Sequence, residues 1–294
     1  MSLPPKLEAH ADHQYQLLLE QQPVIADWDS DYQQQLKTVL GFSQFVSDVL
    51  QRDAGLCREL PAMLASTQRS EHYRQHLNVL LSECQDETQG QRVLRQFRNR
   101  EMVCIAWRDF LASWTLDESL EHLSQLAEAL IFETYQWQYH ICCQEWGTPC
   151  NAEGQAQPML IIGMGKLGGG ELNFSSDIDL IFTYPENGET QGTRRSIANA
   201  QFFTRLGQRI IKMLDQHTFD GFCYRVDMRL RPFGEKWTVG DELRGAGGLL
   251  SRTRARLGAL RDDQRARDGA GNVLAVSRAA PDAASVCVSS LHRF

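Results

Sequence analysis

Two aspartates separated by a single residue, Asp177 and Asp179, are the residues of this chain whose type and spacing point most directly to chemistry. They lie at the start of an apolar run, residues 178–184, which predicts a buried strand that ends before Pro185. Side chains at positions i and i+2 point to the same face of a strand, so the two carboxylates can converge on one cation. Mg²⁺ prefers such hard oxygen ligands and keeps coordination positions for phosphate oxygens. The pair therefore predicts a magnesium site for chemistry at phosphorus.

A third carboxylate is expected from a second strand. Residues 224–231 alternate between apolar and polar side chains, and Asp227 lies on the polar face together with Arg229 and Arg231. Three carboxylates could hold two metal ions, which stabilise the attacking and leaving oxygens of a displacement at phosphorus. The two arginines could bind phosphate oxygens through charge-assisted hydrogen bonds. Taken alone, Asp227 would be an ion-pair partner of Arg225 or Arg229, so the prediction depends on the order and spacing of the whole set.

A glycine-rich segment, residues 163–170, precedes the two aspartates and follows a short apolar run, residues 159–162, that predicts a strand. Gly168 and Gly169 carry no Cβ, so their backbone N–H groups can approach phosphate oxygens closely. A glycine pair followed by Asp-x-Asp on a strand is the pattern of nucleotidyltransferases, and it is the interpretation that we favour.

Two other motifs share part of this segment. Gly163, Gly165 and Gly168 satisfy the GxGxxG spacing of a dinucleotide-binding fold, but the glycines that follow weaken the required helix start. That fold also needs one acid about 20 residues on, whereas two acids lie on the next strand here. Lys166 suggests a P-loop, but Leu167 stands where that motif needs a hydroxyl residue.

Three segments resemble the glutamine synthetase adenylyltransferase family: residues 165–182, residues 225–234 and, just upstream, residues 145–150. The resemblance covers about residues 30–235. It implies the N-terminal unit of such enzymes, which removes AMP from a tyrosine of glutamine synthetase by phosphorolysis to ADP. In the full-length family a second unit attaches AMP from ATP.

The resemblance also implies roles for individual residues and partners. Asp177, Asp179 and Asp227 would be the ligands of Mg²⁺, in two ions, and Gly168 and Gly169 would face phosphate. The partners would be glutamine synthetase, a nitrogen-signalling PII protein, ATP or ADP, and phosphate, all in the cytoplasm. Four further residues are candidates for nucleotide or phosphate contacts: Lys166, Ser176, Arg229 and Arg231.

The surrounding sequence predicts an α+β fold, in which an N-terminal helical bundle precedes a nucleotidyltransferase-type mixed sheet with flanking helices. Helical spacing of apolar residues runs through residues 32–50, 72–81 and 93–111. Thr115 and Glu118 fit a capping box that starts a long helix, and Gly147 ends it. We therefore predict a helical region at residues 1–150 and an incomplete nucleotidyltransferase core at residues 151–235.

Net charge, apolar runs and cysteine spacing argue against several classes of protein. The net charge of −7 argues against a nucleic-acid binder, which normally presents a basic face. The sequence has no secretory signal after Met1 and no apolar run long enough to span a membrane. Eight irregularly spaced cysteines predict reduced thiols rather than a disulfide framework.

Residues 236–294 differ in composition from the rest of the chain. They contain 10 Ala, 9 Arg and 7 Gly but only two aromatic residues, and they predict an irregular, disordered tail. Our hypothesis is that a reading-frame shift after Glu235 produced this segment, which DNA sequencing across that codon would test. The alternative to an active enzyme is then an inactive fragment, at most a binding module for glutamine synthetase or a PII protein.

Overall fold

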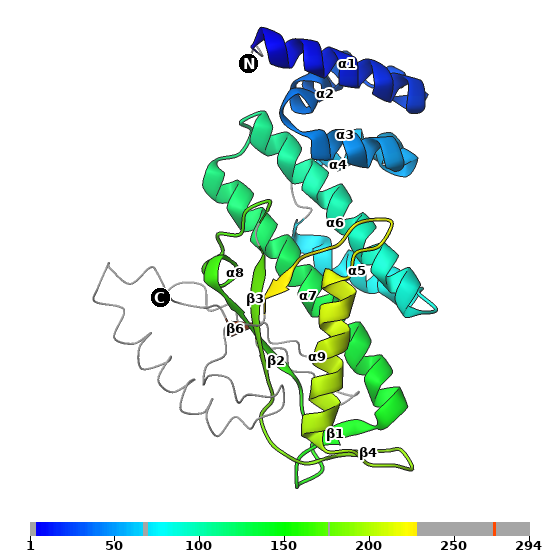
Figure 1. Ribbon diagram of the computed structural model, residues 1–294, viewed down its shortest axis with the longest axis vertical. Helices are drawn as coiled ribbons and strands as arrows, with labels where there is room; N and C mark the ends of the chain where they lie inside the picture. The colour runs from blue at the N-terminus through cyan, green and yellow to red at the C-terminus, as the bar shows by residue number, and fades with distance from the viewer. Residues whose placement is uncertain (1–3, 67–69, 176, 228–272, 275–294) are drawn as a thin grey trace, which may run out of the picture.

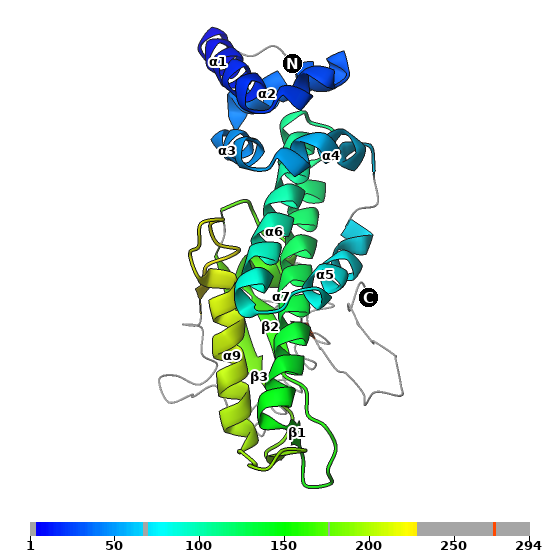
Figure 2. The same cartoon turned by 90° about the vertical axis from the view of Figure 1, so that its right-hand side faces the viewer.

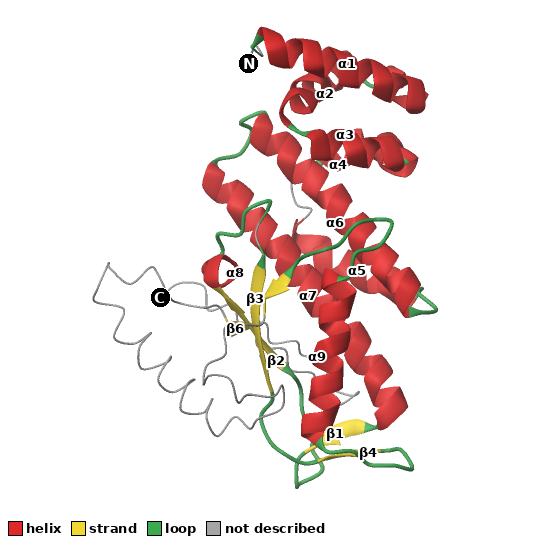
Figure 3. Ribbon diagram, viewed as in Figure 1, coloured by secondary structure: helices red, strands yellow, loops and turns green. Residues whose placement is uncertain are grey.

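The computed structural model describes residues 4–66, 70–175, 177–227 and 273–274 (Figure 1). Long helices make up most of this part, and two small sheets lie beside them (Figure 3). The predicted α+β class, with helices first and a mixed sheet after them, is therefore confirmed. The predicted irregular tail lies outside the described residues, apart from the short strand Val273–Leu274.

Four helices and a 3₁₀ turn form one end of the molecule (Figures 1 and 2). The helical pattern predicted for residues 32–50 is broken at Ser43, which is a correction to that prediction. Ser43 has an extended backbone, and its hydroxyl accepts a hydrogen bond from Val46 N at 3.3 Å, so it caps a new helix. The elements are α1 (Pro5–Gln21), η1 (Pro23–Asp27), α2 (Ser30–Phe42), α3 (Gln44–Arg52) and α4 (Ala54–Ala65).

Three further helices, preceded by a short 3₁₀ turn, form the central part of the molecule. The predicted capping box is confirmed, because Thr115 Oγ1 accepts from Glu118 N and the Glu118 carboxylate accepts from Thr115 N. Gly147, with φ +86°, ends that helix as predicted. The elements are η2 (Ser70–His72), α5 (Tyr73–Ser82), α6 (Glu87–Phe110) and α7 (Leu116–Trp146).

The larger sheet has the strand order β5-β3-β2-β6. Strands β3 and β5 run parallel, whereas β2 is antiparallel to both β3 and β6. A short helix, α8 (Gly165–Gly169), lies between β2 and β3. The strands are β2 (Leu160–Met164), β3 (Ile178–Thr183), β5 (Val226–Asp227) and β6 (Val273–Leu274).

A second, two-stranded sheet pairs β1 (Thr148–Cys150) with β4 (Glu189–Gln191) at the other end of the body (Figure 1). Strand β4 was not predicted from the sequence. Its glutamate and glutamine are exposed and only Thr190 is buried, so no apolar alternation marks it.

One face of the larger sheet packs on helices α7 and α9 (Asn199–Asp215) (Figure 2). The residues at alternate positions of β3 are buried in this core: Ile178, Leu180 and Phe182. Because strand side chains alternate, Asp177 and Asp179 point to the opposite face. The helices therefore fix which face of the sheet can carry chemistry.

Helix α6 contributes to two apolar clusters. Leu94, Met102 and Ile105 belong to the large cluster with α5, α7, α9 and the sheet, whereas Val103 and Trp107 belong to the cluster of α1–α4. The helix thus joins the N-terminal helices to the rest of the body. No helix within the described ranges is long and apolar enough to cross a membrane.

Candidate functional site

Asp179 and Asp227 lie opposite each other on neighbouring strands. Strands β3 and β5 pair in parallel with Ile178 beside Val226 and Asp179 beside Asp227. Neighbouring strands are about 4.8 Å apart, and residues in register point to the same face. Ile178 and Val226 pack into the helical core, so both carboxylates point away from it. The structure thus brings together two aspartates that are 48 positions apart in the sequence.

Asp177 has a different partner. Its carboxylate Oδ1 lies 2.9 Å from Arg225 Nε, in an ion pair whose side chains are 48% and 64% exposed, respectively. Arg225 O also accepts a hydrogen bond from Ile178 N at 2.9 Å, which starts the pairing of β5 with β3. The sequence suggested Arg225 as a partner of Asp227, and in the structure Arg225 forms an ion pair with Asp177. This face of the two strands therefore carries three carboxylates and one guanidinium.

The residues fit a magnesium ion with two carboxylates more readily than with three. Within the described part of the chain, no group of three or more His, Cys, Asp or Glu side chains is close enough to share a metal ion. Asp179 and Asp227 offer a pair of hard oxygen ligands, and Mg²⁺ is commonly held by one or two carboxylates together with waters and substrate phosphates. Asp177 could join them only if its ion pair with Arg225 opened.

Gly165 is a site residue to which sequence reasoning gave no role in the favoured motif. It follows β2 directly, has φ +56°, and is exposed. A Cβ built on Gly165 would lie 2.8 Å from Asp179 Oδ2, so a side chain there would displace the carboxylate. Met164 pairs with Asp179 across β2 and β3, which is why the residue after Met164 reaches it. The signal in the sequence was the position of this glycine at the end of a strand.

The other predicted glycines and their neighbour Lys166 lie in helix α8. Gly168 is buried, whereas Gly169 and Lys166 are exposed. Leu167 and Leu172 anchor this segment in the large apolar cluster, and Leu172 N donates to Ser124 Oγ of α7 at 3.0 Å. Helix α7 therefore holds the glycine-rich segment in place. Three predicted contact residues, Ser176, Arg229 and Arg231, lie outside the described residues.

The strand directions exclude the dinucleotide-binding interpretation. That fold requires the strand before the glycine-rich turn to run parallel to the strand after the helix. Here β2 and β3 are antiparallel and are joined by the five-residue helix α8, which is followed by Gly170 in the left-handed region. The GxGxxG spacing is therefore a coincidence of the glycine-rich segment.

Comparison with known proteins gives the family. The family described as Glutamate-ammonia ligase adenylyltransferase matches residues 33–243, which is well over half of the chain and extends past Glu235. The chain is also 68% identical over 235 residues to the Bifunctional glutamine synthetase adenylyltransferase/adenylyl-removing enzyme of Vibrio parahaemolyticus serotype O3:K6 (strain RIMD 2210633). That alignment covers 80% of this chain and 25% of the relative, so the chain spans about a quarter of that curated relative's length. The predicted resemblance is thereby confirmed, and the chain belongs to the glutamate-ammonia ligase adenylyltransferase family.

Proposed function

We propose that this chain carries a magnesium-dependent nucleotidyl-transfer centre, and that its reaction removes AMP from adenylyl-tyrosine of glutamine synthetase by phosphorolysis. The observation that supports the proposal most is the register of Asp179 with Asp227, on the side of β3 and β5 that faces away from the helical core. The name of the Vibrio relative, which includes an adenylyl-removing activity, supports the choice of reaction. Glutamine synthetase is then the substrate protein, and a PII protein is a proposed regulator.

The proposed reaction is a displacement at phosphorus. An oxygen of inorganic phosphate forms a bond to the α-phosphorus of adenylyl-tyrosine, and the bond from that phosphorus to the tyrosine oxygen breaks. The products are ADP and a tyrosine whose oxygen takes up a proton. Bound Mg²⁺, in one or two ions, would offset the charge that develops on the phosphoryl and leaving oxygens.

The residues of the chain have separate tasks in this scheme. Asp179 and Asp227 would hold the metal, and Gly165 leaves the space that the Asp179 carboxylate occupies. Asp177 would join as a third ligand after leaving Arg225. The proposed phosphate and nucleotide contacts are those predicted from the sequence: Gly168, Gly169, Lys166, Ser176, Arg229 and Arg231.

Phosphorolysis tests the proposal directly. The full chain is incubated with adenylylated glutamine synthetase, Mg²⁺ and phosphate, and ADP is measured. We expect Asp179→Asn to lower ADP formation by about 10²-fold or more, because the metal loses a ligand. The matched control is Asp48→Asn on α3, which should not alter the rate. The Asp48 carboxylate accepts an exposed hydrogen bond from Gln44 at 2.8 Å.

The outcomes separate the two functional classes. No ADP from a folded chain supplied with Mg²⁺ would contradict the proposed activity. Binding of glutamine synthetase or a PII protein without nucleotide chemistry would then favour the binding-module alternative. Attachment of AMP from ATP, without its removal, would assign the other reaction of the family to this site.

A further inference from the structure

Arg95 is a completely buried arginine in the middle of α6, with an exposed fraction of 0%. All the hydrogen bonds described for its guanidinium go to backbone carbonyls. Nε donates to Gly221 O at 2.9 Å, and Nη1 donates to Gln91 O at 2.8 Å and Met213 O at 3.0 Å. Nη2 donates to Gln216 O. The side chain thus joins α6 to two separate points beyond its own helix.

Those two points are the ends of one closed loop. Helix α9 ends at Asp215, and the chain turns back so that Leu214 O accepts hydrogen bonds from Cys223 N at 2.9 Å and Tyr224 N at 3.1 Å. Arg95 bonds to Met213 in the last turn of α9, to Gln216 where the loop begins, and to Gly221 where it returns. We call residues 215–224 the α9–β5 loop. The buried Arg95 guanidinium therefore connects the two ends of the loop by hydrogen bonds.

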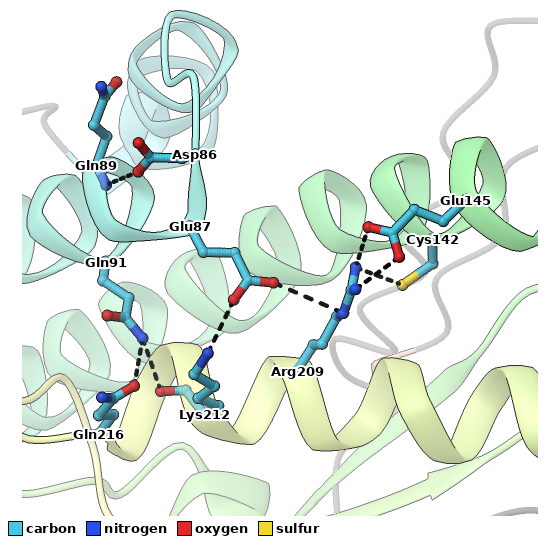
Figure 4. A network of polar contacts seen from close by, with 9 residues as sticks. All are labelled: Asp86, Glu87, Gln89, Gln91, Cys142, Glu145, Arg209, Lys212 and Gln216. Atoms are coloured by element: carbon cyan, nitrogen blue, oxygen red, sulfur yellow. Dashed lines mark hydrogen bonds and ion pairs between the residues drawn. The ribbon is translucent and has the colours of Figure 1, made fainter.

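A neighbouring glutamine on α6 reinforces the same junction. Gln91, one turn before Arg95, donates from Nε2 to Gln216 Oε1 at 2.9 Å and to Lys212 O at 3.4 Å (Figure 4). Carbonyls at the C-terminal end of a helix carry partial negative charge, so Met213 O and Gln216 O suit a guanidinium. Burial lowers the pKa of Arg95, which reflects the loss of water around the charged group. Burying an isolated charge costs free energy, and the hydrogen bonds from Arg95 to these carbonyls offset that cost.

The loop leads directly into the candidate site. Tyr224 is followed by Arg225, whose carbonyl accepts from Ile178 N, and then by Asp227 beside Asp179. Because side chains alternate along a strand, a slip of one residue would move Asp227 to the opposite face of the sheet. The position at which the loop ends therefore decides which side chains meet on β3 and β5.

We propose that Arg95 is a positioning residue, which holds the α9–β5 loop so that Asp227 stands in register with Asp179. The inference rests on the proposed function in so far as these carboxylates bind a metal ion. Arg95 itself is buried on α6 and does not belong to the face that carries them. Its effect on metal binding is therefore transmitted through the backbone of the loop.

The experiment compares Arg95→Met, which keeps most of the volume but donates no hydrogen bond, with two controls in the full chain. Arg92→Met removes an arginine of the same helix that lies 4.0 Å from Asp220 of the same loop but is 69% exposed. Leu36→Ala destabilises the distant cluster of α1–α4. Three quantities are measured: the melting temperature, the hydrogen exchange of the Ile178 amide, and the dissociation constant of Mn²⁺ used as the probe.

We expect Arg95→Met to weaken Mn²⁺ binding by about tenfold or more and to speed exchange of the Ile178 amide, which bonds to Arg225 O. Arg92→Met should change neither quantity, and Leu36→Ala should lower the melting temperature without weakening Mn²⁺ binding. A purely structural role for Arg95 would give the Leu36→Ala pattern and would overturn the inference. If Arg95→Met does not fold, Arg95→Lys, which keeps the charge but not the fork of donors, carries the same comparison.

Failure of the proposed function gives a different result. In that case the wild-type chain forms no ADP and binds no Mn²⁺ at these carboxylates. The exchange of the Ile178 amide then decides the inference alone, since it reports the pairing of β5 with β3 in the absence of any metal. Unchanged exchange in Arg95→Met would show that the loop does not depend on the guanidinium.

Discussion

The N-terminal helices differ from the acidic face of the sheet, by which we mean the face of β3 and β5 that carries Asp177, Asp179 and Asp227, in how well local preferences agree with the fold. In α1–α4, apolar side chains at helical spacing are buried in one cluster, and Ser43 and Asp53 cap the helices that follow them. On the sheet, Asp179 and Asp227 place like charges beside one another, which destabilises a sheet. Gly165 lies in the left-handed region next to them. In the N-terminal helices, the apolar spacing and the capping residues favour the observed fold. On the acidic face, the paired like charges and the left-handed backbone are locally unfavourable.

This difference indicates what each region contributes. Where packing and capping agree with the fold, side chains stabilise the chain, and exceptions to these rules are expected at functional sites. The acidic face depends on support from its surroundings: the core behind β3, the anchoring of α8 by Leu167 and Leu172, and the hold of Arg95 on the α9–β5 loop. Substitutions in the two regions should therefore separate stability from activity.

The largest expected effect is a loss of stability in the N-terminal helices. Leu36 is wholly buried in the α1–α4 cluster, so Leu36→Ala leaves a cavity and should lower the free energy of unfolding by about 3 kcal/mol. Activity per folded molecule should stay the same, because α2 is remote from β3 and β5 (Figure 1). Urea unfolding and ADP formation measure the two quantities. A matched change on the surface, Leu116→Ala at 68% exposure, should alter neither.

The second effect is a loss of activity at the glycine next to Asp179. Gly165→Ala places a Cβ 2.8 Å from Asp179 Oδ2 and should lower ADP formation by about 10²-fold, because the carboxylate must move. The backbone at φ +56° also disfavours alanine, at a cost of about 1 kcal/mol of stability.

Gly170→Ala is the control for that backbone cost. Gly170 has φ +71°, in the same left-handed region, but a Cβ there would meet no atom within 4 Å. It should show a similar loss of stability with little loss of activity. Equal losses of activity in the two variants would mean that strain in the segment, rather than displacement of Asp179, limits the reaction.

The third effect is a loss of stability when the ion pair between Asp53, which caps α4, and Arg100 of α6 is removed. Arg100 bonds to Asp53 at 2.8 Å and 3.0 Å. Burial raises the pKa of Asp53, but the hydrogen bonds from Arg100 and Leu56 N outweigh it and leave the pKa below its ordinary value. Because the folded pKa is depressed, the stabilisation is present above the unfolded Asp pKa of about 3.9 and is lost as the pH falls through the folded value.

Asp53→Asn keeps the cap on α4 but removes the charge. It should lower the free energy of unfolding by about 1 kcal/mol at neutral pH and by nothing once Asp53 is protonated in both states. Denaturant unfolding at several pH values measures the difference between the two proteins. A difference that persists unchanged into strong acid would show that packing, and not the charge, is responsible. ADP formation should be unaffected, as for Leu36→Ala.

The sequence predicted those parts of the molecule that short-range rules determine. The capping box at Thr115 and the buried strand over β3 rest on spacing within a few residues, and both are confirmed. The break at Ser43 was missed because apolar spacing continues across it. The ion pair of Asp177 with Arg225 depends on how two distant strands align, and no local pattern specifies that register. The predicted metal role of Asp177 stays a prediction for the same reason.

The smallest expected effect concerns that ion pair. Arg225→Ala removes the partner that lies 2.9 Å from Asp177, and an exposed pair of this kind contributes about 0–1 kcal/mol, so stability should hardly change. If Asp177 is the third ligand, its release should tighten Mn²⁺ binding by roughly two- to fivefold. Arg58→Ala on α4 removes the same charge far from the site and should leave the dissociation constant unchanged.

Either direction of the Mn²⁺ result distinguishes two arrangements of the acidic face. Tighter binding in Arg225→Ala means that the ion pair competes with the metal for Asp177, so the site gains a ligand when the pair opens. Weaker binding means that the Arg225 guanidinium supports the site, because its ion pair with Asp177 adds to the backbone bond between Ile178 N and Arg225 O and helps to hold β5, with Asp227, against β3. The second result would assign Asp177 to the support of the strand and leave Asp179 and Asp227 as the metal-binding pair.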